Sequence, residues 1–316
     1  MIDLRLAAGA LLLTLVSWGS GCSVQAVPMG EARASVSVSE PERFYSAGAP
    51  ILLDVSVFNA GQEVILAGPQ LWAGERFQLM DAGQQALVAR PLAEVEGERL
   101  EARQRTMRQV DITAVYPQLA EPGRYALTVV FPSYRSNTVA IQIIPAYDPD
   151  QAYLADVVTD RGTFTLRFFP DVAPRHVRNF INLARSGYYD NVIVHRVMPG
   201  VMFQTGDPTS SGRGGPGWTL RAEFNDRPHQ RGTLSMARQA DNPNSAGGQW
   251  FVCLDGVPEW DGRYTVFGEV AAGMDTVDAI GHVKVRKEVP QEEITLQQVL
   301  IRQIADEPAV AGGAAR

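Results

Sequence analysis

"VHRVMPGVMFQTGDP", residues 194 to 208, mixes apolar and polar side chains in an order that a simple core strand does not need. A Pro-Gly pair interrupts the stretch, as expected for a turn between two short strands. Its apolar residues are typical of strands, but Arg196 and Gln204 stand close to the turn, where a strand has no need of them. The question is whether these two side chains form a working surface or only decorate a strand.

The composition sets the class of protein. A chain of 316 residues is long enough for two domains with cores of their own. It carries 28 basic and 35 acidic residues, a formal net charge of -7, which argues against a general nucleic-acid binder. The two cysteines, Cys22 and Cys253, exclude a disulfide-stapled scaffold.

The N-terminus predicts export. Residues 1–22 contain an apolar stretch of signal-peptide length, followed by small residues directly before Cys22. This order is similar to a bacterial lipoprotein processing site, so we expect Cys22 to be lipidated and residues 23–33 to form a tether. An ordinary secretory signal and a retained anchor are the alternatives. All three place the folded part outside the cytoplasm, and with a lipidated Cys22 we expect it to be anchored to a membrane of the bacterial cell envelope.

Residues 34–144 predict a β-sandwich domain, immunoglobulin-like in type. Apolar residues such as Leu53, Val55 and Val57 alternate with polar ones, and turn residues bound the runs. The charged stretch 92–110 is compatible with a helix or a long exposed hairpin. The domain has no histidine and no recognisable chemistry. We expect a spacer or a binding module whose partner is unknown.

Residues 145–150 contain two prolines and predict an extended linker. The sequence then predicts a hairpin over 153–169, a helix that begins near Pro174, a series of short strands, a second helix over 274–280 and a last strand near 294–303. Many strands with two helices predict a closed barrel with helices over its ends. Residues 304–316 are expected to be disordered.

Four fragments from residue 194 onward occur in a familiar order. "VHRVMPGVMFQTGD", "GTLSMAR", "GGQWFVCL" and "DGRYTVFGEV" together resemble the cyclophilin family of peptidyl-prolyl cis-trans isomerases. The resemblance covers 151–303. It implies an eight-stranded antiparallel β-barrel capped by two helices, no cofactor, and proline-containing polypeptides as substrates. With the export signal, it predicts an isomerase that assists the folding of exported proteins.

The chemistry of such a site needs a fixed hydrogen-bond donor. Rotation about a peptide C–N bond costs about 18–20 kcal/mol, and twisting returns the lone pair to the prolyl nitrogen. A cationic donor aimed at that nitrogen stabilises the twisted state more than the planar one, without a covalent intermediate. The resemblance implies Arg196 as the donor, Gln204 as its orienting partner and Phe251 as the pocket floor. It implies a binding groove of His195, Met202, Ala237, Arg238, Gln249, Trp260 and Tyr264.

Two residues depart from the family pattern. Val201 stands where a pocket Phe is usual, and Trp260 takes the position of a pocket Leu. A repacked pocket that binds proline segments or acts as a scaffold without turnover is therefore the alternative function.

The remaining motifs favour structural roles. We expect His176 and His229 to be exposed, Cys253 to be a core residue and 207–218 to be a mobile loop. The dispersed histidines predict no metal site.

Overall fold

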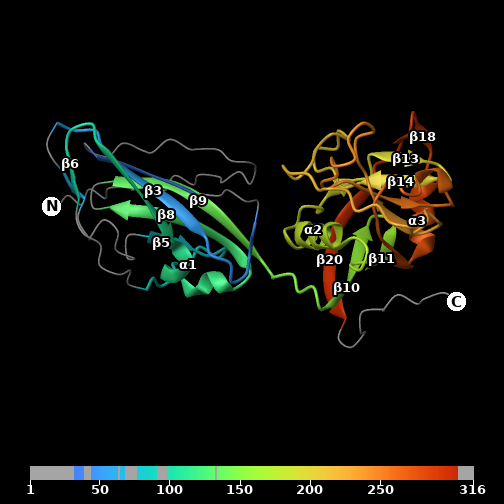
Figure 1. The fold of residues 1–316 in the computed structure, drawn as a ribbon, viewed down its shortest axis with the longest axis horizontal. Helices are drawn as coiled ribbons and strands as arrows, with labels where there is room; N and C mark the ends of the chain where they lie inside the picture. The colour runs from blue at the N-terminus through green and yellow to red at the C-terminus, as the bar shows by residue number, and fades with distance from the viewer. Residues whose placement is uncertain are drawn as a thin grey trace, which may run out of the picture. The chain divides into compact units, whose positions relative to one another are not determined.

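The computed structural model describes residues 32–38, 44–62, 65–67, 77–90, 98–131 and 134–304. The predicted signal peptide, Cys22, most of the tether and nearly all of the tail lie outside these residues. The chain divides into two compact units, Met1–Ile143 and Ile144–Arg316 (Figure 1). In the described part of the chain no helix is both long and apolar enough to cross a bilayer.

The first unit is built from antiparallel sheets around one core. One sheet has the order β1-β3-β7 and another the order β2-β9-β8-β5, while β4 pairs with β6. The strand bounds are β1 (Ala32–Val38), β2 (Tyr45–Ser46), β3 (Leu52–Asn59), β4 (Ile65–Ala67), β5 (Phe77–Met80), β6 (Glu98–Leu100), β7 (Arg105–Asp111), β8 (Gly123–Phe131) and β9 (Tyr134–Ile144).

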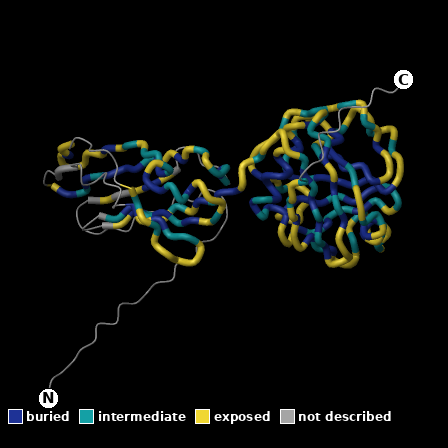
Figure 2. The backbone as a smooth tube through the Cα atoms, turned by 90° about the horizontal axis from the view of Figure 1, so that it is seen from below, coloured by how far each residue is buried: buried dark blue, intermediate teal, exposed yellow. Residues whose placement is uncertain are grey.

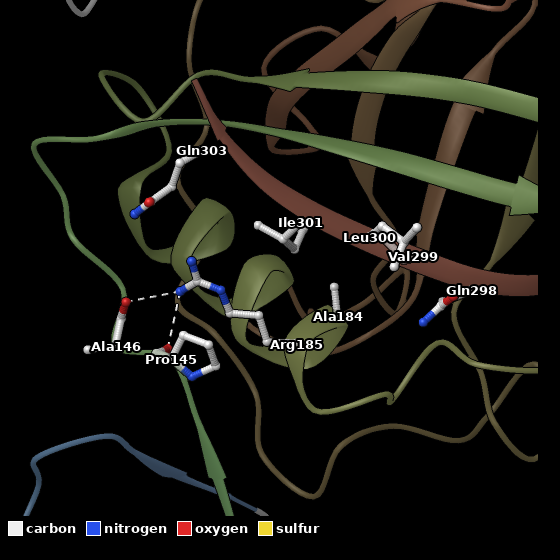
Figure 3. Close-up of a pocket in the computed structure, with 9 residues that line it drawn as sticks. All are labelled: Pro145, Ala146, Ala184, Arg185, Gln298, Val299, Leu300, Ile301 and Gln303. Carbon is white, nitrogen blue, oxygen red and sulfur yellow. Dashed lines mark hydrogen bonds between the residues drawn. The ribbon is translucent and has the colours of Figure 1, made fainter. Parts of the chain in front are cut away.

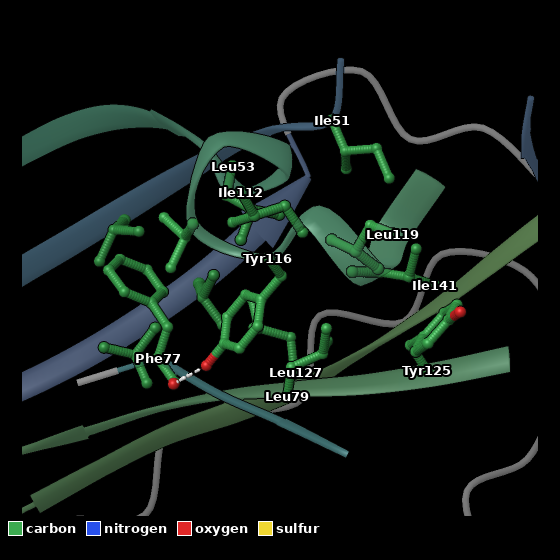
Figure 4. Packing of buried hydrophobic residues seen from close by; sticks show 14 of the residues in the cluster. Ile51, Leu53, Phe77, Leu79, Ile112, Tyr116, Leu119, Tyr125, Leu127 and Ile141 are labelled. Atoms are coloured by element: carbon green, nitrogen blue, oxygen red, sulfur yellow. Dashed lines mark hydrogen bonds between the residues drawn. The ribbon is translucent and has the colours of Figure 1, made fainter. Parts of the chain in front are cut away.

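Buried residues from both larger sheets belong to one hydrophobic cluster (Figure 4). The predicted inward face of Leu53, Val55 and Val57 is fully buried. A short helix α1 (Ile112–Val115) and the 3-10 helix η3 (Pro117–Ala120) close this core. The hydroxyl of Tyr116 donates a hydrogen bond to the Phe77 carbonyl inside it.

The predicted sandwich is supported in part. The structure is mainly β, and the immunoglobulin-like strand arrangement stays a prediction. In the charged stretch 92–110, the described residues 98–110 form the strand β6 and most of β7, and no helix lies there.

The second unit is a curled antiparallel sheet with the order β12-β20-β10-β11-β17-β15-β16-β14-β13. Its strands are β10 (Ala152–Thr159), β11 (Gly162–Phe168), β12 (Val192–Ile193), β13 (Arg196–Met198), β14 (Met202–Thr205), β15 (Thr233–Met236), β16 (Trp250–Cys253), β17 (Val266–Ala272) and β20 (Thr295–Ile304). In Figure 2 buried residues, in dark blue, lie mainly in the interior of this unit, and exposed residues, in yellow, lie mainly at its outside.

The sheet has nine strands where the sequence predicts eight. The difference lies between β12 and β13, which are successive pieces of one segment. β12 pairs with β20, whereas β13 pairs with β14, so the segment changes partner at Val194 and His195. The two edge strands of the curled sheet are thus joined by two residues.

Two helices pack on this sheet. α2 (Pro174–Arg185) lies against β17 and β20, and α3 (Met274–Gly281) lies against β11 and β14. Pro174 starts α2, as predicted, because a missing N–H costs nothing in the first turn. Gly187, with φ 72°, ends it in the left-handed region.

The predicted linker lies within the second unit and is held to α2. Nη1 of Arg185 donates to the carbonyls of Pro145 and Ala146, at 3.1 and 3.0 Å (Figure 3). A hollow of about 400 Å³ lies beside this clamp, between α2 and the outer side of β20. Its lining contains no His, Cys, Asp or Glu, and it lies apart from the residues predicted to be catalytic.

Candidate active site

Strand pairing brings the three predicted catalytic residues together. β13 pairs with β14 so that Arg196 lies opposite Gln204, and β14 pairs with β16 so that Gln204 lies opposite Phe251. Residues directly opposite each other in a ladder point to the same face of a sheet. The three side chains therefore form a row across neighbouring strands. A turn at Pro199 and Gly200 fixes this register through a 2.9 Å bond from Val201 N to Met198 O.

The polar part of the site is a hydrogen-bonded chain. Nη1 of Arg196 lies 3.4 Å from Gln204 Oε1, and Gln204 Nε2 donates to Gln249 Oε1 at 2.8 Å. Gln249 in turn donates to the Gly214 carbonyl at 2.9 Å. On its other side, Nε of Arg196 contacts Glu288 Oε2 at 2.7 Å. Glu288 is a site residue that the sequence did not reveal.

The apolar part is a box of rings. Trp260 and Tyr264 meet the Phe251 ring edge to face, with centroids 5.2 and 5.6 Å away. They also contact each other at 5.9 Å. Met202 and Cys253 are buried beside Phe251, and Val201 and Ala237 pack against this cluster. Trp260 and Val201 thus pack against the same cluster, and compensation of one by the other stays a prediction.

His229 lies behind this box, which corrects the expectation that it is exposed. The residue is buried, and its ring stacks on Phe251 at 6.0 Å with an interplanar angle of 12°. Its Nδ1 lies 2.9 Å from Asp261 Oδ1 and its Nε2 lies 3.1 Å from the Ser235 hydroxyl. Burial lowers the pKa of His229, while Asp261 acts in the opposite direction. Burial of a single polar residue leaves no periodic hydrophobic pattern, so no signal in the sequence marked His229 as buried.

His176 corrects the same expectation. It is fully buried in the first turn of α2, with Nδ1 2.6 Å from Glu223 Oε2. The Glu223 carboxylate also accepts from the backbone N–H groups of Arg175 and His176, at 3.2 and 3.1 Å. Burial lowers the pKa of His176, although Glu223 opposes that shift. The residue is therefore structural.

His195 is half-buried where β12 passes to β13. Neither ring nitrogen has a partner at hydrogen-bond distance among the described residues. The Gln249 amide is nonetheless near enough to act on its pKa, which burial lowers. Gly212 covers this ring, because a Cβ there would lie 3.4 Å from His195 Cδ2.

The loop over His195 is organised by Asp207. Its buried carboxylate accepts four hydrogen bonds, from Thr209 N, Thr209 Oγ1, Ser211 Oγ and Gly214 N. Burial alone would raise the pKa of Asp207, but these bonds outweigh it and lower the pKa to about 2. The loop predicted to be mobile thus has an internal hydrogen-bonded centre.

The Arg238 side chain folds back onto its own loop and Tyr264, and the predicted substrate contact of its backbone stays a prediction. Its guanidinium donates to the carbonyls of Arg263, Gln239 and Ala240 and stacks 4.8 Å from the Tyr264 ring centre.

Cys253 is buried as predicted, and burial raises its thiol pKa to about 12, so it is no nucleophile. The described residues hold no cluster of three or more His, Cys, Asp or Glu suited to a metal ion.

The comparisons with known proteins agree with this geometry. Residues 154–302 match the family described as cyclophilin type peptidyl-prolyl cis-trans isomerase/CLD. A peptidyl-prolyl cis-trans isomerase-like 1 of Aspergillus fumigatus is 40% identical over 161 residues, which are 48% of this chain and 98% of that protein. The chain belongs to the cyclophilin family. The predicted family and enzyme class are thereby confirmed, and the domain is a peptidyl-prolyl cis-trans isomerase.

Two further proteins are similar to part of the chain. A peptidyl-prolyl cis-trans isomerase of Synechococcus elongatus is 46% identical over 111 residues, 35% of this chain and 75% of its own length. A Cryptosporidium parvum cyclophilin, crystallised in the presence of the dipeptide Ala-Pro, is 31% identical, with a TM-score of 0.46. It covers 47% of this chain and 98% of the solved one.

Proposed function

We propose that this cyclophilin domain isomerises X-Pro bonds by electrostatic stabilisation of the twisted amide, with Arg196 as the donor. The observation that carries the proposal is the register that aligns Arg196, Gln204 and Phe251 across β13, β14 and β16. It sets a permanent cation beside a hydrophobic floor, which is the pairing that a prolyl bond requires.

The proline ring of the substrate would rest on Phe251. Trp260, Tyr264 and Met202 would surround it, since they form one cluster with that floor. An aliphatic ring in such a box is held by dispersion and by exclusion of water. The carbonyl side of the bond would stay free to rotate in the open part of the groove, near Gln204 and Gln249.

Catalysis would come from the change at nitrogen. In the planar amide its lone pair is delocalised, and in the twisted form it accepts a hydrogen bond. A guanidinium N–H that already points there needs no reorganisation and favours the twisted state. His195, Ala237 and Gln249 would hold the flanking peptide backbone. No proton is transferred, and no covalent bond is formed or broken.

The substrates would be exported proteins. Support comes from the signal-like residues 1–22 and from the slow isomerisation of X-Pro bonds, a step that can limit the folding of a chain after transport. We further propose that lipidated Cys22 holds the enzyme at a membrane.

The test of the mechanism separates turnover from affinity. Arg196→Ala should lose acceleration of X-Pro exchange while it keeps most of its affinity for the peptide. Equal loss of both would show that Arg196 only binds.

A further inference from the structure

The turn between β18 (Val285–Arg286) and β19 (Val289–Pro290) reaches the catalytic arginine. Oε2 of Glu288 lies 2.7 Å from Nε of Arg196. The backbone joins the same two segments, because Val197 N donates to the Glu288 carbonyl at 2.7 Å. The turn is therefore fastened to β13 by main chain and side chain together.

The backbone of this turn is unusual for its residues. Lys287 and Glu288 have φ of 52° and 65°, both in the left-handed region. Two-residue hairpin turns of this kind normally use Asn or Gly, which adopt positive φ at little cost. Glutamate has no such advantage, and strained positions of this sort gather at functional sites. A glycine would serve the turn better, so the carboxylate calls for another explanation.

The contacts around the guanidinium give that explanation. Among the described residues, Nη1 of Arg196 has a long contact of 3.4 Å to Gln204 Oε1, and Nη2 lies 3.4 Å from Met198 Sδ, a weak acceptor. The Glu288 contact is the short one. The Arg196 side chain is 42% exposed, so without a firm partner it would spread over several rotamers. An ion pair on Nε reduces that freedom and leaves both Nη groups available.

We infer that Glu288 is a positioning residue that holds the Arg196 guanidinium in its productive orientation. The inference rests on the proposed function, since it needs Arg196 to be the donor. The carboxylate binds the edge of the fork that faces the hairpin. The Nη edge is thereby turned toward Gln204 and Met198, which packs against the Phe251 cluster. Glu288 itself does not touch the substrate.

The test uses the full chain and the substitution Glu288→Gly. Glycine suits the left-handed turn, so the melting temperature should stay the same or rise. Turnover of an X-Pro peptide should fall roughly tenfold through loss of orientation, with KM changed less than about twofold. Glu288→Gln keeps a hydrogen-bond acceptor without the charge, so its turnover should lie between those of the parent and of Glu288→Gly.

The chain offers a matched control in Glu269. It pairs with Arg167 across β11 and β17, and its side chain is exposed to a similar degree, 37% against 45% for Glu288. Glu269→Gln removes a similar surface ion pair outside the candidate site. It should leave turnover unchanged.

A double-mutant cycle separates this inference from the function on which it rests. In an Arg196→Lys background, which lacks Nε, Glu288→Gly should change turnover less than about twofold. Full turnover in Glu288→Gly, with Arg196→Ala inactive, would overturn the positioning role and leave the mechanism intact. Full turnover in Arg196→Ala would overturn the mechanism itself. A lower melting temperature with turnover lost equally in both backgrounds would show that Glu288 is merely structural.

Discussion

At the scale of the residue, His229 links the pocket floor to pH. Its ring supports Phe251 from behind, and its two nitrogens face Asp261 and Ser235. Because burial lowers the pKa of His229, the folded protein holds this ring neutral below the pH at which a free histidine takes up a proton. Protonation of His229 in acid would therefore disturb its packing against Phe251.

We predict that stability falls as the pH drops below about 6.5, the pKa of an unfolded histidine. The folded pKa values of His229 and His176 are both lowered, so the unfolded chain binds more protons in that range. The stabilisation is complete above the unfolded pKa and is lost as the pH falls through the folded one. Urea unfolding at pH 5, 6 and 7 measures this.

The charges that face each ring are known. Asp261 faces His229 and Glu223 faces His176, and both oppose the shift without reversing it. NMR titration should place the midpoint of the His229 ring below 6.5. A midpoint above that value, or stability that rises between pH 7 and 5, would contradict the prediction.

At the scale of the element, Gly206 directly follows β14, and its backbone packs closely against the loop that precedes β16. It has φ 88°, and a Cβ there would lie 2.4 Å from the Gly248 carbonyl oxygen. That contact is with backbone, so no side chain can move aside. The element thus needs glycine for its conformation and for its space.

We expect Gly206→Ala to lower the free energy of unfolding by about 3 kcal/mol or more, because backbone strain and a steric clash add. Gly200→Ala is the control. It has a similar φ of 73°, with nothing within 4 Å of the added Cβ. It should cost only about 1–2 kcal/mol from the left-handed backbone. Urea unfolding compares the two, and equal losses would show that the Gly248 contact yields.

Much of the second unit could be predicted from the spacing of apolar residues along its sequence. The predicted strand near 202–205, the helix that begins at Pro174 and the helix near 274–280 correspond to β14, α2 and α3. Alternation and helical spacing depend only on which face of an element is buried, so they can be read from the local sequence.

What the sequence did not predict depends on contacts between distant segments. The break between β12 and β13 follows from two different partner strands, which no local pattern encodes. Glu288 meets Arg196 across 92 residues, on a turn without the usual Asn or Gly. His229 is buried by rings from other strands. That Arg196, Gln204 and Phe251 share one site could be predicted only from the family resemblance.

At the scale of the whole molecule, each unit has its own buried core, and the second carries the isomerase site. The role of the first unit and the anchoring of the chain rest on the sequence. We predict that labelled fatty acid is incorporated into the parent protein in a bacterial host and not into Cys22→Ser. Label retained by Cys22→Ser would rule out lipidation at that residue.

The most direct test of the account compares turnover and affinity at Arg196. NMR exchange of an X-Pro peptide gives the turnover, and chemical-shift titration gives the Kd, for the parent, Arg196→Ala and the control Arg167→Ala. The account predicts a loss of turnover of about 100-fold or more in Arg196→Ala, as for loss of an electrostatic donor, with Kd changed only a few-fold. The control should match the parent. Turnover that survives in Arg196→Ala, or that falls only in step with affinity, would contradict the account.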